Sequence, residues 1–562
     1  MKPLGPLSVV PAPVRRLFGA PRRSLYVGGP ILTMDPQNRI VEALGVESDR
    51  IAAVGSRAEL EAWADGSARV VDLAGRALLP GFIDAHGHFP GRGIFAVQVD
   101  LNSPPIGDVE TMADLLARLR ERARKTRSGR WIVGWGYDDT LLAEKRHPTR
   151  EVLDAVSQEH PVVCWHVSGH LAAANGLALE RAGISADTPD PEGGLIRRDP
   201  RSGEPDGVLE ESASDPLQGG SRPSFLDALR ITRAGSALYL RAGVTTVHSG
   251  YTLERYMRGL TWLSRLGVVA PRLVLWPGDE LAQRMLDGSV RYSSYDERWV
   301  RLGAAKLLAD GSIQGYTGYL SQPYHVPPGD DPAYRGYPRM PREELIEKVA
   351  RRHAAGWQVA VHGNGDAAID DILDAFEHAQ RQHPRADARH VVIHSQMARE
   401  DQLDRMKALG VIPSFFSLHT YYWGDRHREV FMGPERAARM SPARSALDRG
   451  LRFTLHCDSP VVPMEPLRLV WAAVNRRSTS GASIGDAQRI PPLAALRAVS
   501  IDAAWQHFEE HEKGSLEPGK LADLVILSES PLEHPEHPER IDRIRVLETI
   551  LGGRVVYRAT DS

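Results

Sequence analysis

Eight short apolar runs constrain the fold of this chain more than any other feature of its sequence. The first continues into "LLPGFIDAHGH" at 78–88, and the others lie at 243–250, 272–276, 301–311, 357–363, 389–395, 410–416 and 451–458. From the second run onward, nearly every gap holds a stretch with helical periodicity, as at 342–356, 366–380 and 399–410. This alternation predicts an α/β fold, a (β/α)8 TIM barrel with a parallel, buried inner sheet.

The two chain ends predict a second, smaller unit. Residues 25–78 contain short β-branched runs separated by Gly, Asp and Asn, and residues 512–562 repeat this texture. Chain ends commonly lie close in space, so we expect one composite β-sandwich domain from both ends beside a barrel domain at 79–511. An insertion after the first barrel strand, about residues 100–235, is expected to cover the barrel mouth as a subdomain. The basic, proline-broken residues 1–24 are interpreted as a flexible tail.

Composition limits the classes of function. The chain has 562 residues, a formal net charge of -3 and 42% hydrophobic residues, so we expect no nucleic-acid or membrane partner. Its two cysteines, Cys164 and Cys457, exclude a disulfide framework and a thiolate-rich zinc site. No apolar h-region of a signal peptide is evident at the N-terminus, so the cytoplasm is the expected compartment. A small-molecule substrate and a homodimer are the default partners.

Residues that can bind a metal stand at the ends of several runs. The set comprises His86 and His88 after the first run, His248 in the second, His362 in the fifth, His394 in the sixth and Asp458 closing the eighth. Side chains two apart in an extended strand point to the same side, and a barrel presents its strand ends at one face. Each residue alone is more often structural, but together they predict a metal site.

Lys306 lies within the fourth run. A lysine inside a barrel strand is rarely buried unless another group pairs with it or modifies it. Carboxylation requires the neutral amine, which burial favours, and it converts a cation into an anionic ligand. The alternative is a lysine that faces outward or pairs with Asp310.

The ordered segments "GFIDAHGH", "KLLADGS", "VHGNGD", "VIHSQ" and "LHCDSP" resemble the amidohydrolase superfamily. The chain is most similar to its third family, the YtcJ-like and N-substituted formamide deformylase-like metal-dependent hydrolases. The likeness includes "GWGYDD" and "GSLEPGKLADLVIL" and spans nearly everything after about residue 25. It implies a barrel with a β-sandwich and a zinc centre of one or two ions. Manganese, iron or nickel are the other options for such ligands.

The resemblance also implies a role for each ligand-type residue. His86, His88 and Asp458 would hold one ion, His362 and His394 the other, and carboxylated Lys306 would bridge them. A metal-activated hydroxide would cleave the C–N bond of an amide-type substrate, such as an N-substituted formamide or an N-acyl amine. Asp458 would act as the proton shuttle, its alternative role being that of a ligand or strand-end cap. His248 matches no ligand position of the family and is expected to support the rim.

The segment "SFFSLHTYYWGDRH" at 414–427 is expected to form a pocket wall. We predict substrate contacts from His419, Tyr421 and Trp423, although the same aromatic residues are equally typical of lid packing. His170 in the insertion and Gln314 after the fourth run are further candidates.

Two other functions fit less well. A mononuclear deaminase of the superfamily carries a glutamate three residues after the fifth-strand histidine, where this chain has Gly365. A catalytically inactive, metal-binding regulatory protein usually lacks a ligand or the strand-eight aspartate, and this chain retains the whole set.

Overall fold

The computed structural model describes residues 23–220 and 222–560, and its two chain ends form one sheet. Its order is β23–β22–β21–β5–β1–β2–β3, with β4 paired to β1. The strands are β1 (Arg23–Leu32), β2 (Ile40–Glu47), β3 (Arg50–Gly55), β4 (Arg69–Asp72), β5 (Ala77–Pro80), β21 (Leu524–Leu527), β22 (Val546–Leu551) and β23 (Arg554–Arg558). Antiparallel pairing of β21 with β5 joins the N-terminal and C-terminal parts. The ends therefore meet in a single sheet, while the two-layered sandwich and the domain boundaries stay predictions.

Almost all of the expected flexible tail, residues 1–24, lies outside the described residues. Its last two residues, Arg23 and Ser24, begin β1. Helix α2 (Arg57–Ala64) covers part of the composite sheet and begins at a capping box made by Ser56 and Glu59.

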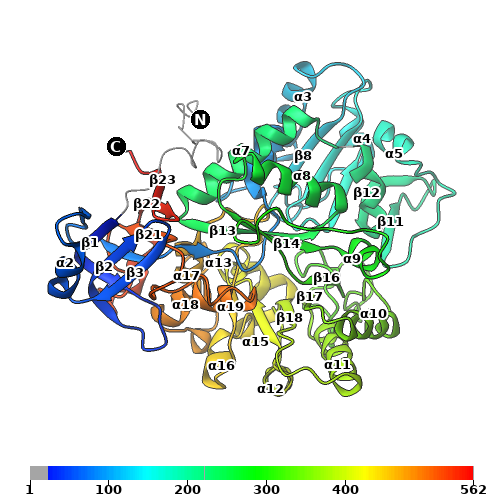
Figure 1. Cartoon of the computed structure of the whole chain (residues 1–562). Coiled ribbons are helices and arrows are strands. Elements are labelled where there is room, and N and C mark those ends of the chain that lie inside the picture. Colours follow the sequence, from blue (N-terminus) through cyan, green and yellow to red (C-terminus); the bar gives the residue numbers. More distant parts are fainter. Residues whose placement is uncertain (1–22, 221, 561–562) are drawn as a thin grey trace.

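The eight predicted runs form parallel strands in the middle of the molecule (Figure 1). One sheet has the order β15–β14–β13–β6, and the other has the order β16–β17–β18–β19–β20. The strands are β6 (Phe82–Ile83), β13 (Val244–Thr252), β14 (Arg272–Pro277), β15 (Val300–Leu302), β16 (Ala305–Leu308), β17 (Val359–Gly363), β18 (Val391–His394), β19 (Ile412–Phe415) and β20 (Thr454–Leu455). The α/β class is confirmed. Over residues 23–220 and 222–560, strand pairing gives two sheets and not one closed ring, so the barrel stays a prediction.

The fourth run is divided between the two sheets. The Gly303 N–H donates to the Leu275 carbonyl of β14, whereas the Ala305 N–H donates to the Gln358 carbonyl just before β17. A Cβ at Gly303 would lie 2.4 Å from Trp276 Nε1. Only glycine permits this close approach, and the strand changes partner there.

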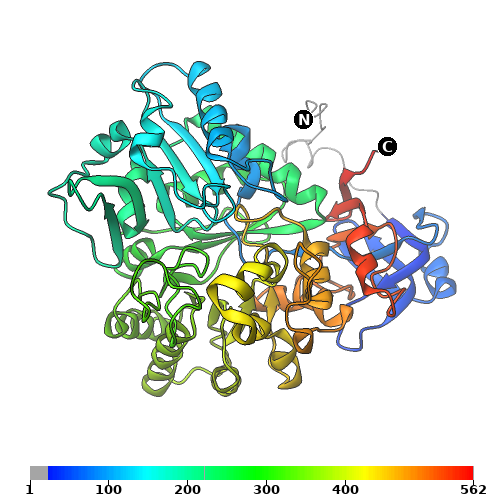
Figure 2. The same ribbon diagram turned by 180° about the vertical axis from the view of Figure 1, so that it is seen from behind.

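Helices connect the parallel strands and pack outside them (Figures 1 and 2). The predicted helical stretches at 342–356, 366–380 and 399–410 correspond to α10 (Arg342–Ala354), α11 (Asp366–Gln382) and α12 (Glu400–Leu409). The other helices along this part are α7 (Phe225–Arg241), α8 (Glu254–Arg265), α9 (Asp279–Leu286), α15 (Gly433–Arg439), α16 (Ala443–Asp448), α17 (Pro466–Asn475), α18 (Pro492–Ala498) and α19 (Ile501–Gln506). Short 3₁₀ helices are η1 (Gly91–Ala96), η4 (Asp486–Gln488) and η5 (Pro538–Arg543).

The segment between β6 and β13 builds its own sheet, with the order β11–β12–β10–β9–β8–β7. Its strands are β7 (Val99–Asp100), β8 (Ile132–Tyr137), β9 (Val162–His166), β10 (Leu171–Ala174), β11 (Gly194–Arg198) and β12 (Pro205–Glu211). Its helices are α3 (Met112–Arg124), α4 (Arg150–Asp154), α5 (Gly176–Ala182), α6 (Asp215–Gly220) and the turn η2 (Ser212–Ser214). This insertion lies at the opposite end of the molecule from the composite sheet (Figure 1).

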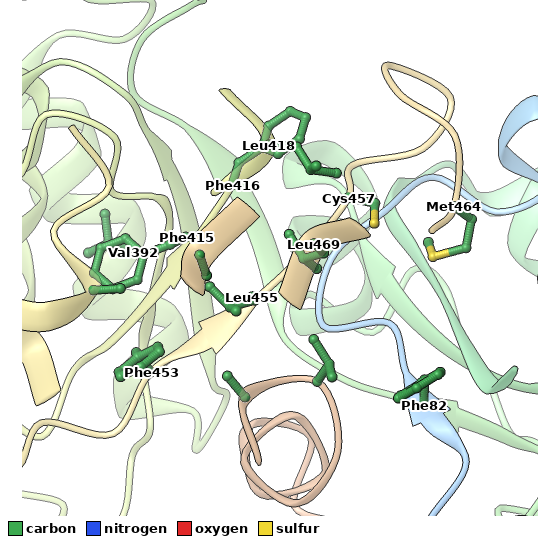
Figure 3. Close-up of a cluster of buried hydrophobic side chains, with 14 of the residues drawn as sticks. Phe82, Val392, Phe415, Phe416, Leu418, Phe453, Leu455, Cys457, Met464 and Leu469 are labelled. Atoms are coloured by element: carbon green, nitrogen blue, oxygen red, sulfur yellow. The ribbon is translucent and has the colours of Figure 1, made fainter. Parts of the chain in front are cut away.

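A buried apolar cluster fixes the strands that lead to the histidines (Figure 3). Phe82, Val392, Phe415 and Leu455 come from β6, β18, β19 and β20, and each is at most 1% exposed. Burial of a side chain of this size contributes about 1.5–3 kcal/mol. The residues that follow these strands are therefore held at defined positions.

No helix in the described part of the chain is both long enough and apolar enough to cross a membrane.

Candidate metal centre

His86 and His88, which follow β6, meet Asp458, which follows β20. Asp458 Oδ1 lies 3.3 Å from His88 Nε2 and 3.7 Å from His86 Nε2. The other oxygen, Oδ2, lies 3.9 Å from Nε2 of His394 at the end of β18. One carboxylate thus faces three imidazoles from two separate parts of the chain. The ligand atoms of His86, His88 and Asp458 have the spacing of a metal site.

Two further contacts hold the rings of His362 and His394. Their ring centroids are 4.6 Å apart. His362 Nδ1 lies 3.0 Å from Asp310 Oδ1, and the Asp310 carboxylate accepts the N–H groups of Asn364 and Gly365. His394 Nδ1 lies 3.1 Å from Nε2 of His456. Each ring is thus held through Nδ1, an arrangement typical of metal-binding histidines. Nε2 of His362 also lies 3.4 Å from Asn364 Nδ2, and Nε2 of His394 faces Asp458.

Lys306, on β16, is 1% exposed, so it lies inside the molecule. Burial lowers the pKa of its amine to about 7, although Asp458 and Asp310 act in the opposite direction. Within the described residues, its Nζ has no hydrogen-bond partner. The oxygens of Asp310 are already engaged by backbone N–H groups and His362. A buried, unpaired polar group is costly, so this amine is a candidate for pairing or modification.

The charge states also suit a metal. Burial lowers the pKa of His86, His362 and His394 well below the ordinary value, so these rings are neutral and can ligate. Burial raises the pKa of Asp458, but His88 and His456 outweigh this effect and hold it below the ordinary value. His86 Nδ1 and Asp458 Oδ1, like Lys306 Nζ, are buried and lack hydrogen-bond partners in the part of the chain described. Imidazole and carboxylate donors without thiolate fit zinc or a similar divalent ion.

The backbone is strained at two of these residues. His394 has a φ of 71° and Asp458 a φ of 53°, both in the left-handed region that non-glycine residues seldom adopt. Each such residue costs about 1–3 kcal/mol, and such strain clusters at functional sites. With these backbone conformations, Nε2 of His394 and Oδ2 of Asp458 lie 3.9 Å apart.

Comparison with known proteins decides the family. A family model described as "Amidohydrolase family" matches residues 69–557, which is most of the chain. The chain belongs to the amidohydrolase family. It is therefore a hydrolase of the class that acts on carbon–nitrogen bonds, and the resemblance inferred from its motifs is confirmed.

The relatives of this amidohydrolase match it over nearly their full length. It is 28% identical to N-substituted formamide deformylase of Arthrobacter pascens, over 96% of this chain and 99% of that protein. It is 28% identical to putative amidohydrolase YtcJ of Bacillus subtilis (strain 168), over 95% and 99%. The crystal structure of an uncharacterized metal-dependent hydrolase from Pyrococcus horikoshii OT3 is similar, with a TM-score of 0.72 and 26% identity over 92% and 99%.

Sequence reasoning about the amidohydrolase missed the residues that support the ligands. The ring of His456 lies beside those of His86 and His394, at centroid distances of 5.3 and 5.1 Å. Its position two residues before Asp458 was a usable signal, because such residues share a side of a strand. Asp310 was considered only as a partner of Lys306, whereas it holds His362.

Two more buried residues lie behind the first histidine. The ring of His248 is 5.2 Å from that of His86, and its Nδ1 lies 3.1 Å from the backbone of Gly87. The ring therefore lies next to His86, and the supporting role of His248 stays a prediction. Asp84 is buried, and desolvation raises its pKa to about 8, with Asp458 acting in the same direction.

Two predicted substrate residues of the amidohydrolase lie beside the ligand histidines. His170 has its ring centroid 4.9 Å from that of His362, and its Nδ1 lies 2.9 Å from Glu211 Oε2. His419 stacks 6.3 Å from His394, and its buried Nδ1 has no hydrogen-bond partner among the described residues. Both imidazoles thus lie next to the candidate ligands His362 and His394, and their contact with a substrate stays a prediction.

The other three predicted substrate residues lie farther out or contact other groups. Trp423 packs 5.7 Å from His419, and its indole N–H donates to Asp138 Oδ2 at 3.1 Å. Gln314 is buried, and its Oε1 has no partner within the described chain. The ring of Tyr421 packs against Trp471 of α17. The structure therefore does not place Tyr421 with the histidines.

Proposed function

We propose that this amidohydrolase is a metal-dependent hydrolase that cleaves the C–N bond of an N-substituted formamide, an N-acyl amine or a related amide. The observation that carries the proposal is the convergence of His86, His88, His394 and Asp458 on one buried place beside the unpartnered amine of Lys306. Similarity to N-substituted formamide deformylase supports the substrate class.

The donor set would hold zinc, as one or two ions. His86, His88 and Asp458 would bind one ion and His362 and His394 the other, with carboxylated Lys306 shared between them. A bound divalent ion polarises a carbonyl group and lowers the pKa of water.

The same proposal includes a closed (β/α)8 barrel. Its support is a set of contacts between the two parallel sheets. The His88 N–H donates to the Ser459 carbonyl at 2.9 Å, which joins the segments after β6 and β20. A parallel bridge between Gly278, which follows β14, and Lys306 of β16 joins the two sheets on the other side.

Asp458 is the residue proposed to move the proton. Its carboxylate is ionised at neutral pH, because its pKa lies below the ordinary value. Oδ1 has no hydrogen-bond partner in the described structure, so it can accept a proton from the attacking water and deliver it to the leaving nitrogen. The rings of His170 and His419 would orient the amide, with Trp423 and Gln314 in the wall.

The deaminase alternative requires a glutamate at position 365, where this chain has a glycine. A Cβ on Gly365 would lie 1.8 Å from the Tyr319 carbonyl oxygen. The glutamate of such deaminases has no space there unless the backbone moves.

Amine release from a substrate panel tests the proposal. Protein loaded with zinc is incubated with N-alkyl formamides, N-acetyl amines, N-acyl amino acids and carbamates, and the released amine is quantified. We expect release from a formamide or N-acyl amine that stops after treatment with a chelator and returns with zinc. Release of ammonia from an aminated heterocycle, with every amide intact, would contradict the proposal.

A further inference from the structure

A second buried group of metal-ligand residues lies in the insertion, and the proposed hydrolysis does not use it. We name Asp138, Asp139, His147 and His166 the insertion cluster. The ligand atoms of Asp138, Asp139 and His166 all lie within 4.8 Å of one another. His147 Nε2 lies 3.6 Å from Asp139 Oδ2. The side chain of His166 is 0% exposed, and none of the other three is fully exposed.

Two neighbouring strands bring these residues together. β8 and β9 are parallel, and Tyr137 at the end of β8 pairs with His166 at the end of β9. Asp138 and Asp139 continue directly from β8. Carboxyl ends of adjacent parallel strands are a common place for a bound ligand.

Nδ1 of each imidazole in the insertion cluster lies within hydrogen-bond distance of a hydroxyl group. His147 Nδ1 lies 3.1 Å from the Tyr137 hydroxyl, and His166 Nδ1 lies 2.8 Å from Ser168 Oγ. Both Nε2 atoms then face Asp139, at 3.6 and 3.2 Å. A metal-binding histidine is typically fixed in this way through its other nitrogen.

The decisive observation is an unpartnered nitrogen. His166 Nε2 is fully buried and lies 3.2 Å from Asp139 Oδ1, yet it makes no hydrogen bond within residues 23–220 and 222–560. The same combination occurs at the main centre, where Asp458 Oδ1 lies 3.3 Å from His88 Nε2 and lacks a hydrogen-bond partner. In both places a histidine nitrogen and a carboxylate oxygen are close together but do not form a hydrogen bond. A cation between them would satisfy both atoms.

The charges around the insertion cluster also favour a bound cation. Asp138 Oδ2 accepts the Trp423 indole N–H at 3.1 Å and lies 3.5 Å from Arg426 Nη1. Asp139 instead faces the two imidazoles of the cluster. Asp138 is buried and the side chain of Asp139 is 16% exposed. Two adjacent carboxylates with one guanidinium leave a negative charge, which is costly in a largely buried place unless it is paired.

We propose that the insertion cluster binds a divalent ion of the zinc class through Asp139, His147 and His166, beside Asp138. Two imidazoles and a carboxylate are ligands typical of zinc. The ion fastens the ends of β8 and β9. Asp138 accepts the indole N–H of Trp423. The ion therefore also stabilises the contact between the insertion and the segment that carries His419.

Anomalous X-ray diffraction from wild-type crystals tests the site. Crystals are grown with zinc chloride and without chelator, and data are collected above and below the zinc absorption edge. We expect a zinc peak enclosed by Asp139, His147 and His166, in addition to the peak at Asp458. A map with no peak inside the cluster overturns the proposal, whatever the occupancy at Asp458.

Metal content in solution gives a second readout. Asp139→Asn and His166→Gln are each compared with the wild type by elemental mass spectrometry, after circular dichroism has shown that each variant is folded. We expect each variant to lose one zinc equivalent. His160→Gln is the matched control, because His160 is a buried histidine of the insertion that bonds to Ser157 and Thr126. Unchanged zinc content in the folded cluster variants contradicts the proposal.

Discussion

Lys306 and Asp458 are the two residues on which the proposed chemistry depends most. Lys306 is 1% exposed and Asp458 is 8% exposed, and each has a polar atom without a hydrogen-bond partner within the described chain. Buried polar atoms in folded proteins nearly always have a partner. The proposed metal ion, together with the proposed carboxylation of the amine, would give both atoms a partner.

Asp458→Asn tests the proton transfer. The amide keeps the size of the side chain but cannot accept the proton, so we expect kcat to fall about 10²–10⁴-fold, with a smaller effect on KM. Steady-state kinetics on the best amide substrate give both values. Asp448→Asn, at a side chain that is 55% exposed on α16, is the control and is expected to keep wild-type kinetics. Unchanged turnover in Asp458→Asn would remove Asp458 from the proton path.

Lys306→Met tests the buried amine in metal-free protein. The pKa of Lys306 is about 7 in the fold, against an ordinary value of 10.5. At a pH between these two pKa values, the Lys306 amine is protonated in the unfolded chain and neutral in the folded one. The free energy of unfolding therefore rises with pH, by at most about 1.4 kcal/mol per pH unit. Lys306→Met should have a flatter pH dependence.

Urea unfolding of chelator-treated protein at about pH 7.5 and about pH 9.5 measures this difference. Lys125→Met, at a side chain that is 70% exposed, should keep the wild-type pH dependence. Equal pH dependence in wild type and Lys306→Met would show that the amine of Lys306 is not perturbed.

At the scale of elements, the first parallel strands hold His86 through close packing with β13. Gly250 lies on β13, and a Cβ there would be 2.6 Å from Cε1 of His86 and 3.2 Å from Cε1 of His248. The ring of His86 therefore touches the backbone of the neighbouring strand, which leaves no space for a side chain.

Gly250→Ala should displace the His86 ring and weaken zinc binding about 10–100-fold, the usual cost of losing the support of a metal ligand. Competition with a zinc chelator of known affinity measures the change. Gly259→Ala on α8 is the matched control, because a Cβ there meets nothing within 4 Å. Equal zinc affinity in the two variants would show that His86 does not contribute to zinc binding.

The sequence allowed the α/β class and the order of the strands to be predicted, because alternation and periodicity are local signals. The division of the fourth run into β15 and β16 depends on which neighbour each residue pairs with, and no local pattern reports that. The support of His362 by Asp310 is likewise a tertiary contact.

Tyr421 shows how local secondary structure separates neighbouring aromatic side chains. The predicted wall grouped residues 419, 421 and 423 without assigning them to a helix or a strand. The structure instead has helix α13 (Leu418–Tyr422), followed by α14 (Gly424–Arg426) and the π-helical turn η3 (His427–Phe431). On a helix, residues four apart share a face. His419 and Trp423 therefore stay together, while Tyr421 turns toward Trp471.

At the scale of the whole molecule, a buried ion pair joins the composite sheet to the parallel strands. Arg272, the first residue of β14, donates to both oxygens of Asp523 at 2.6 and 3.0 Å, and their side chains are 4% and 3% exposed. Asp523 directly precedes β21. The contact fixes the sheet of the chain ends against the strands that carry the metal residues.

Arg272→Ala leaves the Asp523 carboxylate buried without its cation, so we expect a loss of about 3–5 kcal/mol in the free energy of unfolding. Urea unfolding measures the loss. Arg298→Ala is the control, because that side chain is 55% exposed in its pair with Asp296 and should change stability by less than about 1 kcal/mol. Equal losses in the two variants would show that the buried pair does not hold the parts together.

The metal content of the wild type and of the double variant His86→Ala/His88→Ala tests the central claim most directly. Both proteins are purified without chelator, dialysed against zinc and measured by elemental mass spectrometry, with folding checked by circular dichroism. The account predicts that the double variant holds at least one zinc equivalent less than the wild type. Equal zinc contents in two folded proteins would contradict it.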